Sequence, residues 1–252
     1  MGEVNMSRHD IVVTAGALVL GAAIWEAVGR IFHPEAVPPF TSVVAAFGRQ
    51  LSDGEITSTL GHTLGSFGIG LGISLGGGLV IGALMGLWRP LRQALSPFVS
   101  LAQWIPAALI APVYFAIFQL SMWTEIVVVI HFAVFVVIIN TQAAFEATDA
   151  ALLEMARSFG ADGRQAALRI RLPAALPMIF AGLRVGAGRA VKGVIVGELY
   201  LGILGLGGVV DKYGQEFDAT NLLAVCLVIL IMSLIVGALT RAVERRFTRW
   251  AD

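Results

Sequence analysis

Six apolar stretches, each near the length needed to cross a lipid bilayer, constrain the fold of this chain more than any other feature. Because about 20 residues of α-helix cross the hydrocarbon core, each stretch predicts a transmembrane helix. We therefore expect an all-α, polytopic membrane protein with six transmembrane helices, built as a single transmembrane domain over residues 1–252. The stretches cover approximately residues 11–32, 61–87, 98–119, 123–145, 174–200 and 221–242.

Composition excludes several other classes of protein. Hydrophobic residues make up 57% of the chain and charged residues only 13%, which is the profile of a polytopic membrane protein. The formal net charge is zero, so no overall field would attract nucleic acid. The single cysteine, Cys226, excludes an intrachain disulfide and a thiolate metal cluster, and we interpret it as core or lipid-facing.

The positions of the basic residues predict the orientation in the membrane. An even number of spans puts both termini on one side, and most arginines fall on that side, against only Arg30, Arg49 and Lys212 on the other. By the positive-inside rule, both termini are expected in the cytoplasm. The arginines on the predicted cytoplasmic side are Arg8, Arg89, Arg92, Arg157, Arg164, Arg169, Arg171, Arg241, Arg245, Arg246 and Arg249.

The longest polar, basic insertion between the apolar stretches is residues 149–173, and we expect a helix–turn–helix elbow there. Asp149 can cap a first short helix, which Gly160 ends. Asp162, followed three residues later by Gln165, forms a capping-box pattern that starts a second short helix, and Leu172–Pro173 is expected to end it. On the first helix, apolar residues at three- and four-residue spacing lie on one side, with polar residues elsewhere. The apolar residues are Leu152, Met155, Ala156 and Phe159, and the polar ones are Glu154, Arg157 and Ser158.

The elbow carries a resemblance to a known family. Glu154-Met155-Ala156, Gly160 four residues later, and Leu172-Pro173 resemble the EAA motif of the membrane subunits of bacterial ABC importers. From about Val37 to the C-terminus the chain is similar, more closely, to the permeases for nitrate, sulfonates and taurine. The segments that carry this likeness are Phe159-Gly160-Ala161, Leu172-Pro173-Ala174-Ala175-Leu176-Pro177, Gly182-Leu183-Arg184 and Gly205-Leu206-Gly207.

The resemblance implies a type I ABC importer permease fold in the bacterial inner membrane, with a family-like core over about residues 55–245. It implies three protein partners: cytoplasmic ABC ATPase subunits, an extracytoplasmic solute-binding protein and a second copy of the chain. The chain has no Walker pattern, so we expect no cofactor and no ATPase activity in it, with ATP and Mg²⁺ held by the partner. The elbow is then the coupling helix that docks on the ATPase, through Leu152, Glu154, Met155, Ala156, Arg157, Ser158, Phe159, Gly160 and Asp162.

Two stretches are candidates for the translocation pathway. In 98–119, Pro106 and Pro112 each remove an intrahelical hydrogen bond, and irregular backbone at membrane depth is tolerated where it lines a cavity. We therefore expect Gln103, Trp104 and Pro106 to line the pathway, although a kink used only for packing is an equal alternative. The family usually continues with Trp-Phe-Gly, whereas this chain reads Ile117-Phe118-Gln119, which weakens any transfer of substrate.

The stretch 174–200 holds charged residues at membrane depth, where they normally face a wet cavity or a partner. Arg189, Lys192 and Glu198 are the pathway candidates, while Arg184 lies near the cytoplasmic end and can snorkel. Lys192 and Glu198 are about 240° apart around the helix, so they cannot pair with each other. Structural pairing with another helix is the alternative, and Glu26 is one conceivable partner.

Three further expectations concern packing and connectors. The glycine-rich stretch 61–87 is expected to pack closely against neighbouring helices. After Val37-Pro38-Pro39, Thr41 or Ser42 can cap a short helix. Gly202, Gly205, Gly207 and Gly208 indicate a flexible external turn.

The leading hypothesis is the permease subunit of an ATP-driven importer for a small, anionic solute such as a sulfonate, taurine or nitrate. One alternative is the same class of importer carrying a pyrimidine or thiamine precursor. Another is a secondary transporter that uses Lys192 and Glu198 as ion-coupling groups. Copurification of an ATPase chain would separate the importer from the secondary transporter. A membrane enzyme has little support, because His9, His33, His62 and His131 are scattered without metal-ligand spacing.

Overall fold

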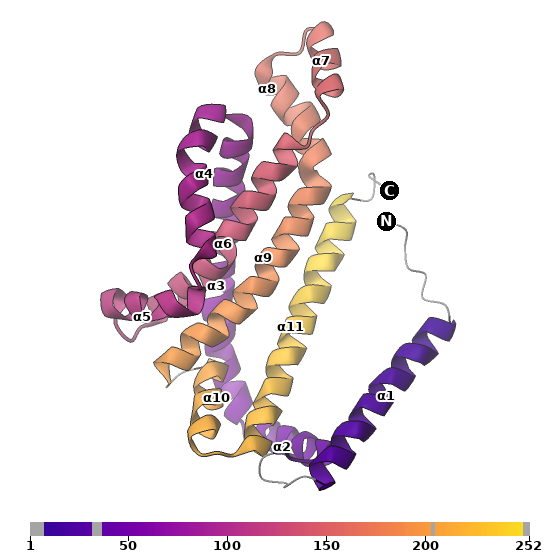
Figure 1. Ribbon diagram of the computed structural model, residues 1–252, viewed down its shortest axis with the longest axis vertical. Helices are drawn as coiled ribbons and strands as arrows, with labels where there is room; N and C mark the ends of the chain where they lie inside the picture. Colours follow the sequence, from indigo (N-terminus) through magenta and orange to yellow (C-terminus); the bar gives the residue numbers. More distant parts are fainter. Residues whose placement is uncertain (1–7, 32–36, 203–204, 249–252) are drawn as a thin grey trace.

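The computed structural model describes residues 8–31, 37–202 and 205–248, and within these ranges all regular structure is helical, as the sequence predicts. Arg249 and His33 lie outside the described residues. In chain order (Figure 1) the helices are α1 (Arg8–Ile31), α2 (Phe40–Ser52), α3 (Glu55–Leu87), α4 (Arg89–Trp104), α5 (Ala107–Phe118), α6 (Met122–Glu146), α7 (Ala150–Ser158), α8 (Gly163–Ala166), the π-helical segment η1 (Ala167–Arg171), α9 (Leu172–Leu201), α10 (Gly205–Gln215) and α11 (Ala219–Thr248).

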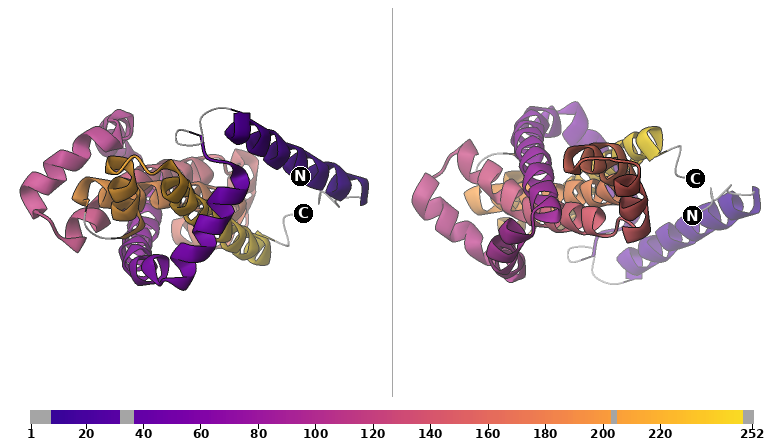
Figure 2. Two further views of the ribbon diagram at one scale, coloured as in Figure 1. Left: turned by 90° about the horizontal axis from the view of Figure 1, so that it is seen from below. Right: turned by 90° about the horizontal axis from the view of Figure 1, so that it is seen from above.

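Three long helices, α3, α6 and α9, form the centre of the molecule, with α6 packed against both of the others. The buried residues of α6 are mainly β-branched or small, and Val128, Val129, Ala133 and Val137 are all fully buried. α11 packs along α9, and α2 and α10 cover the ends of α3, α9 and α11 (Figures 1 and 2). α1 stands apart from the bundle and contacts α2.

Glycines of α3 allow its backbone to approach α6 closely, as the glycine-rich sequence predicts. A Cβ atom placed on Gly82 would lie 2.6 Å from the carbonyl oxygen of Ile138, and one on Gly78 would lie 2.7 Å from the Val137 side chain. Contacts this short leave no room for a side chain. In a bilayer, helices associate through packing, so these small residues hold α3 against α6.

Among the described residues, five helices are long and apolar enough to cross a membrane by length and composition, or six if a bent pair of helices is taken as one span. The expected span 98–119 is not one straight helix. α4 and the part of α5 from Leu109 to Phe118 meet at 105°, and the bend follows Ile105 and Pro106, whose extended backbone separates the two helices. The proline therefore interrupts the helix, as expected, and this stretch provides the sixth span only if the bent pair is taken as one broken span.

The second arm of the elbow continues directly into α9. The expectation that Leu172–Pro173 ends this arm was wrong, because helical backbone runs through both residues and the apolar segment Gly163–Tyr200 forms one candidate span. The π-helical turn η1 immediately precedes α9, and Pro173 is the second residue of α9. A proline is tolerated there because the first N–H groups of a helix need no intrahelical partner.

Two connectors also differ from expectation. α2 begins at Phe40 after Pro39 and has no side-chain cap, and the Thr41 hydroxyl instead hydrogen-bonds to Glu26 at 3.0 Å. The glycine-rich segment after α9 is not simply a turn, because Gly205 to Gly208 form the start of α10. Gly202 has a φ of +65° and ends α9, which is the left-handed conformation that glycine favours at this position.

The packing of α3 against α6 gives a stability prediction. Gly82→Ala forces a methyl group against the α6 backbone, a strain of about 1–3 kcal/mol, and should lower the unfolding temperature in detergent by roughly 5 °C. Gly76→Ala is the matched control, since no atom lies within 4 Å of the added methyl group. Equal unfolding temperatures for the two variants, measured by fluorescence-detected size exclusion, would contradict the packing argument.

Candidate functional site

The elbow, defined here as residues 149–171, has the local structure that its sequence predicts. The Asp149 carboxylate accepts a hydrogen bond from the Ala151 N–H at 2.9 Å and caps α7. Gly160 ends this arm with a φ of +81°. Asp162 and Gln165 form the capping box at α8, because the Gln165 N–H donates to Asp162 at 2.6 Å and the Asp162 N–H donates to Gln165 at 3.2 Å. All three sequence signals are confirmed.

Apolar residues of α7 and Phe159, which directly follows it, form an exposed surface at the elbow tip of the molecule (Figure 1). Phe159 is 85% exposed, Met155 52% and Leu152 42%, whereas Ala156 is buried. Glu154, Arg157, Ser158 and Gly160 are exposed around them. Between the two arms is a cavity of about 280 Å³ lined in part by Arg157, Asp162 and Arg171. An exposed aromatic ring beside charged groups is chemistry that suits a protein partner.

A second candidate site is a cavity of about 360 Å³ between the end of α4 and the middle of α6 and α9. The structure brings five of the six predicted pathway residues together in its wall, Glu198 being the exception. The lining residues are Ala102, Gln103, Trp104, Ile105, Pro106, His131, Phe132, Phe135, Arg189 and Lys192.

Three polar side chains of this cavity lack partners among the described residues. Arg189 and Lys192 form no ion pair or hydrogen bond with any other described residue. The Gln103 side-chain oxygen is buried without a hydrogen-bond partner. Two cations thus face one cavity with no anion paired to them in the part of the chain that the structure describes, beside an amide oxygen without a hydrogen bond. Lys192 also lines a neighbouring, mostly apolar cavity of about 540 Å³ with Phe132, Ile195 and Ile229.

Glu198 lies away from these cavities, at the end of the bundle opposite the elbow. Its side chain is fully buried, and its carboxylate accepts a hydrogen bond of 2.9 Å from the Gly207 N–H at the start of α10.

The suggestion that Glu26 pairs with a charged residue of the stretch 174–200 was wrong. Glu26 instead pairs with Arg30 at 2.6 Å and accepts a hydrogen bond from Thr41. Arg184, near the elbow end of α9, pairs with Glu244 of α11 at 2.7 Å.

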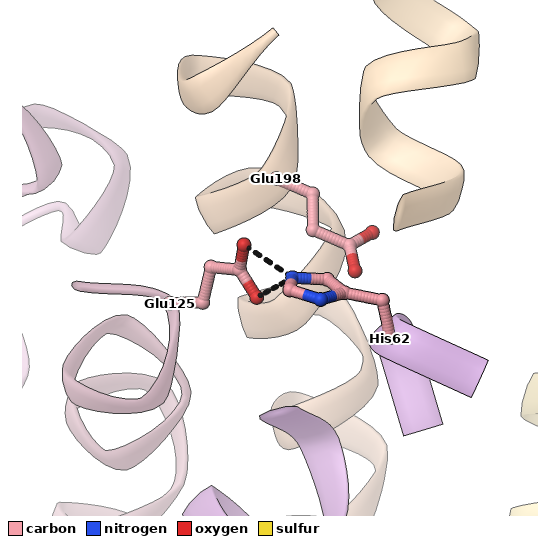
Figure 3. Close-up of side chains that lie close together, drawn as sticks. All are labelled: His62, Glu125 and Glu198. Carbon is pink, nitrogen blue, oxygen red and sulfur yellow. Dashed lines mark hydrogen bonds and ion pairs between the residues drawn. The ribbon is translucent and has the colours of Figure 1, made fainter. Parts of the chain in front are cut away.

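Around Glu198, the structure adds two residues that sequence reasoning did not join to it. His62 of α3 and Glu125 of α6 lie beside it, and the His62 Nε2 is 2.9 Å from both carboxylate oxygens of Glu125 (Figure 3). Each is a polar residue near the edge of an apolar stretch, and this position is the signal by which the sequence could have marked it as a candidate. The two residues are far apart in the sequence, so the sequence does not show that they lie together.

The same end of the bundle is held by an exposed ion pair. The Lys212 ammonium on α10 donates to Glu55 at 2.9 Å, and the Tyr213 hydroxyl donates to the other oxygen of Glu55 at 2.6 Å. The bond to Glu55 raises the pKa of Lys212, and burial, followed by that bond, raises the pKa of Tyr213. α10 is therefore fixed to the start of α3.

The family described as "Binding-protein-dependent transport system inner membrane component" matches residues 78–249, which is more than half of the chain and includes the elbow and both cavity-lining cations. The chain belongs to this family. It is an ABC transporter permease and an inner membrane component. It is not itself an enzyme, because the ATPase is a separate subunit.

Relatives agree with this assignment across most of the permease. A putative aliphatic sulfonates transport permease protein, SsuC, of Bacillus subtilis is 26% identical over 91% of this chain and 84% of its own length. The formylaminopyrimidine transport permease protein ThiX of Halalkalibacterium halodurans is 26% identical over 90% of this chain and 91% of its own.

A solved structure supports the fold. A chain of the MetNI methionine ABC transporter in inward-facing conformations superposes with a TM-score of 0.62, covering 77% of this permease and 94% of that chain at 22% identity. The type I importer architecture expected from the EAA-like elbow is thereby confirmed, and the EAA motif and coupling helix are typical of the family.

Proposed function

We propose that this permease carries a small anionic solute, of the sulfonate type, inward across the membrane in an ATP-driven importer. The observation that carries the proposal is the pair of cations, Arg189 and Lys192, that face a cavity without a counter-ion among the described residues. Arg189 is partly exposed and Lys192 is exposed, and charged groups at membrane depth are costly unless they meet water or a group of opposite charge. The similarity to an aliphatic sulfonate permease supports the same class of solute.

In this proposal a soluble binding protein delivers the solute on one side, and two ATPase subunits act on the other. The permease works as a pair of identical chains, with the route at their interface. Both termini and the elbow face the cytoplasm, as the distribution of arginines favours. In keeping with this, α1 begins and α11 ends toward the elbow side of the molecule (Figure 1). ATP and Mg²⁺ are held by the ATPase, and this chain needs no cofactor.

The elbow is the proposed contact with the ATPase. Its exposed apolar residues, Leu152, Met155 and Phe159, suit a hydrophobic groove, while Glu154 and Arg157 suit a polar rim. Because the second arm continues through η1 into α9, a displacement of the elbow reaches the helix that carries Arg189 and Lys192. Energy from nucleotide binding would then change the exposure of the cavity.

A pyrimidine is the second candidate solute. The cavity also presents aromatic side chains, Trp104, Phe132 and Phe135, and Trp104 is 84% exposed. Such rings can stack on a flat heterocycle. The similarity to a formylaminopyrimidine permease supports this candidate.

The elbow proposal predicts uncoupling without loss of the folded permease. Gly160→Pro is incompatible with a φ of +81° and removes the N–H that bonds to the Arg157 carbonyl at 2.9 Å. Glu154→Lys reverses an exposed charge on the predicted contact surface. Both variants should insert into the membrane at normal levels and lose at least about tenfold of ATP-dependent uptake, measured in vesicles that contain the whole importer.

Gly163→Pro is the matched control for Gly160→Pro. Gly163 is the first residue of α8, a position where proline is tolerated, and Asp162 before it is already extended. This control should retain uptake. Normal uptake by Gly160→Pro or Glu154→Lys would count against the coupling role, and ATP-independent uptake would favour a secondary transporter.

The anion proposal predicts a selective effect of Lys192→Met. Loss of a charge-assisted contact with the solute should reduce uptake of an alkanesulfonate roughly tenfold or more. Uptake of formylaminopyrimidine is measured in parallel. Lys212→Met, which removes the exposed lysine of α10, is the control and should change sulfonate uptake less than about twofold. Unchanged sulfonate uptake in Lys192→Met would remove this residue from the route.

A further inference from the structure

A cluster of one partly exposed histidine and two buried glutamates, at the end of the bundle opposite the elbow, has the composition of a metal site. His62 of α3, Glu125 of α6 and Glu198 of α9 each offer a ligand atom, and these atoms lie within 4.8 Å of one another. Figure 3 shows the imidazole between the two carboxylates, one on each side. The three residues come from the three central helices.

Burial makes the two carboxylates costly without a cation. Glu125 and Glu198 are both fully buried, and His62 is the basic residue that pairs with Glu125 among the described residues. One oxygen of Glu198, Oε1, is buried and has no hydrogen-bond partner. A buried carboxylate oxygen without a hydrogen-bond partner carries a large desolvation penalty. The protein thus presents an unused acceptor beside an imidazole and a second carboxylate.

A neighbouring set of groups orients both carboxylates. The Ser66 hydroxyl donates to Glu125 Oε2, and the Gly207 N–H donates to Glu198 Oε2 at 2.9 Å. A side chain at Gly205 would overlap the Glu198 carboxylate, so the α10 backbone closes the site on that side. Metal ligands are characteristically held by such outer hydrogen bonds. Neither bond uses Glu198 Oε1, which remains available.

We infer that His62, Glu125 and Glu198 bind a divalent cation of the Zn²⁺ class that ties together α3, α6 and α9. One imidazole nitrogen and two carboxylate oxygens are a ligand set that Zn²⁺ accepts, with water in the fourth position. Ligands at about 2.1 Å from a tetrahedral metal stand about 3.4 Å apart, which small side-chain rotations reach from the present spacing. A divalent ion with a neutral imidazole also cancels the two carboxylate charges.

The inference is tested on the full-length protein in detergent, stripped with a chelator and titrated with Zn²⁺ or Co²⁺ alone. We expect one tightly bound ion per chain and a rise in unfolding temperature of about 5 °C or more at saturating Zn²⁺. His62→Gln should weaken Zn²⁺ affinity at least about tenfold. Loss of a residue that only hydrogen-bonds to a metal ligand already lowers metal affinity by about that factor. His131→Gln, in the separate cavity, is the control and should bind normally.

A second measurement does not depend on any variant folding. X-ray absorption at the zinc edge of the wild-type protein should show a shell of nitrogen and oxygen ligands with one imidazole. Binding of much less than one ion per chain would overturn the inference. So would wild-type affinity in His62→Gln, or a ligand shell that contains sulfur or more than one imidazole. These results are independent of the transported solute.

Discussion

Close packing of α6 against α3 and α9 is the interaction on which the rest of this permease depends. In a bilayer, apolar side chains gain little by leaving lipid for protein, so helices must associate through shape. Gly78 and Gly82 bring the α3 backbone against α6, and Gly186 of α9 does the same at Val137, where an added Cβ would lie 2.6 Å from the side chain. Because protein interiors at such contacts resist compression, the three helices form a stiff body.

The stiff body connects two chemically different ends. At one end the elbow extends beyond the bundle and continues as one helical path into α9. At the other end Glu198, near the C-terminal end of α9, is enclosed by α3, α6 and α10. Between them, Arg189 and Lys192 face a cavity bordered by the broken helix pair α4 and α5. One helix thus carries the proposed solute contact and the buried carboxylate, and its continuation through η1 and α8 adjoins the α7 arm that makes the proposed motor contact.

Motifs that act over a few residues predicted much of this arrangement. Contacts between residues far apart in the sequence were not predicted. Asp149, Gly160 and the Asp162–Gln165 pair act on residues within one turn, so their effects could be inferred from spacing alone. Pro106 interrupts its helix for an equally local reason. Pro173 was misjudged because a π-helical turn and a position in the first turn of α9 remove its usual cost. The cluster of His62, Glu125 and Glu198 depends on the packing of three helices, which no local pattern encodes.

The central claim is that an ATPase chain acts on this permease at the elbow. The most direct measurement attaches a benzophenone photo-crosslinker to Phe159→Cys in a Cys226→Ser background, within the intact importer. Phe217→Cys is the matched control, since Phe217 is 90% exposed, against 85% for Phe159, and follows α10 at the opposite end. The account predicts an adduct between this chain and the ATPase from position 159 and none from position 217. No adduct from 159, or an adduct from 217 alone, would contradict it.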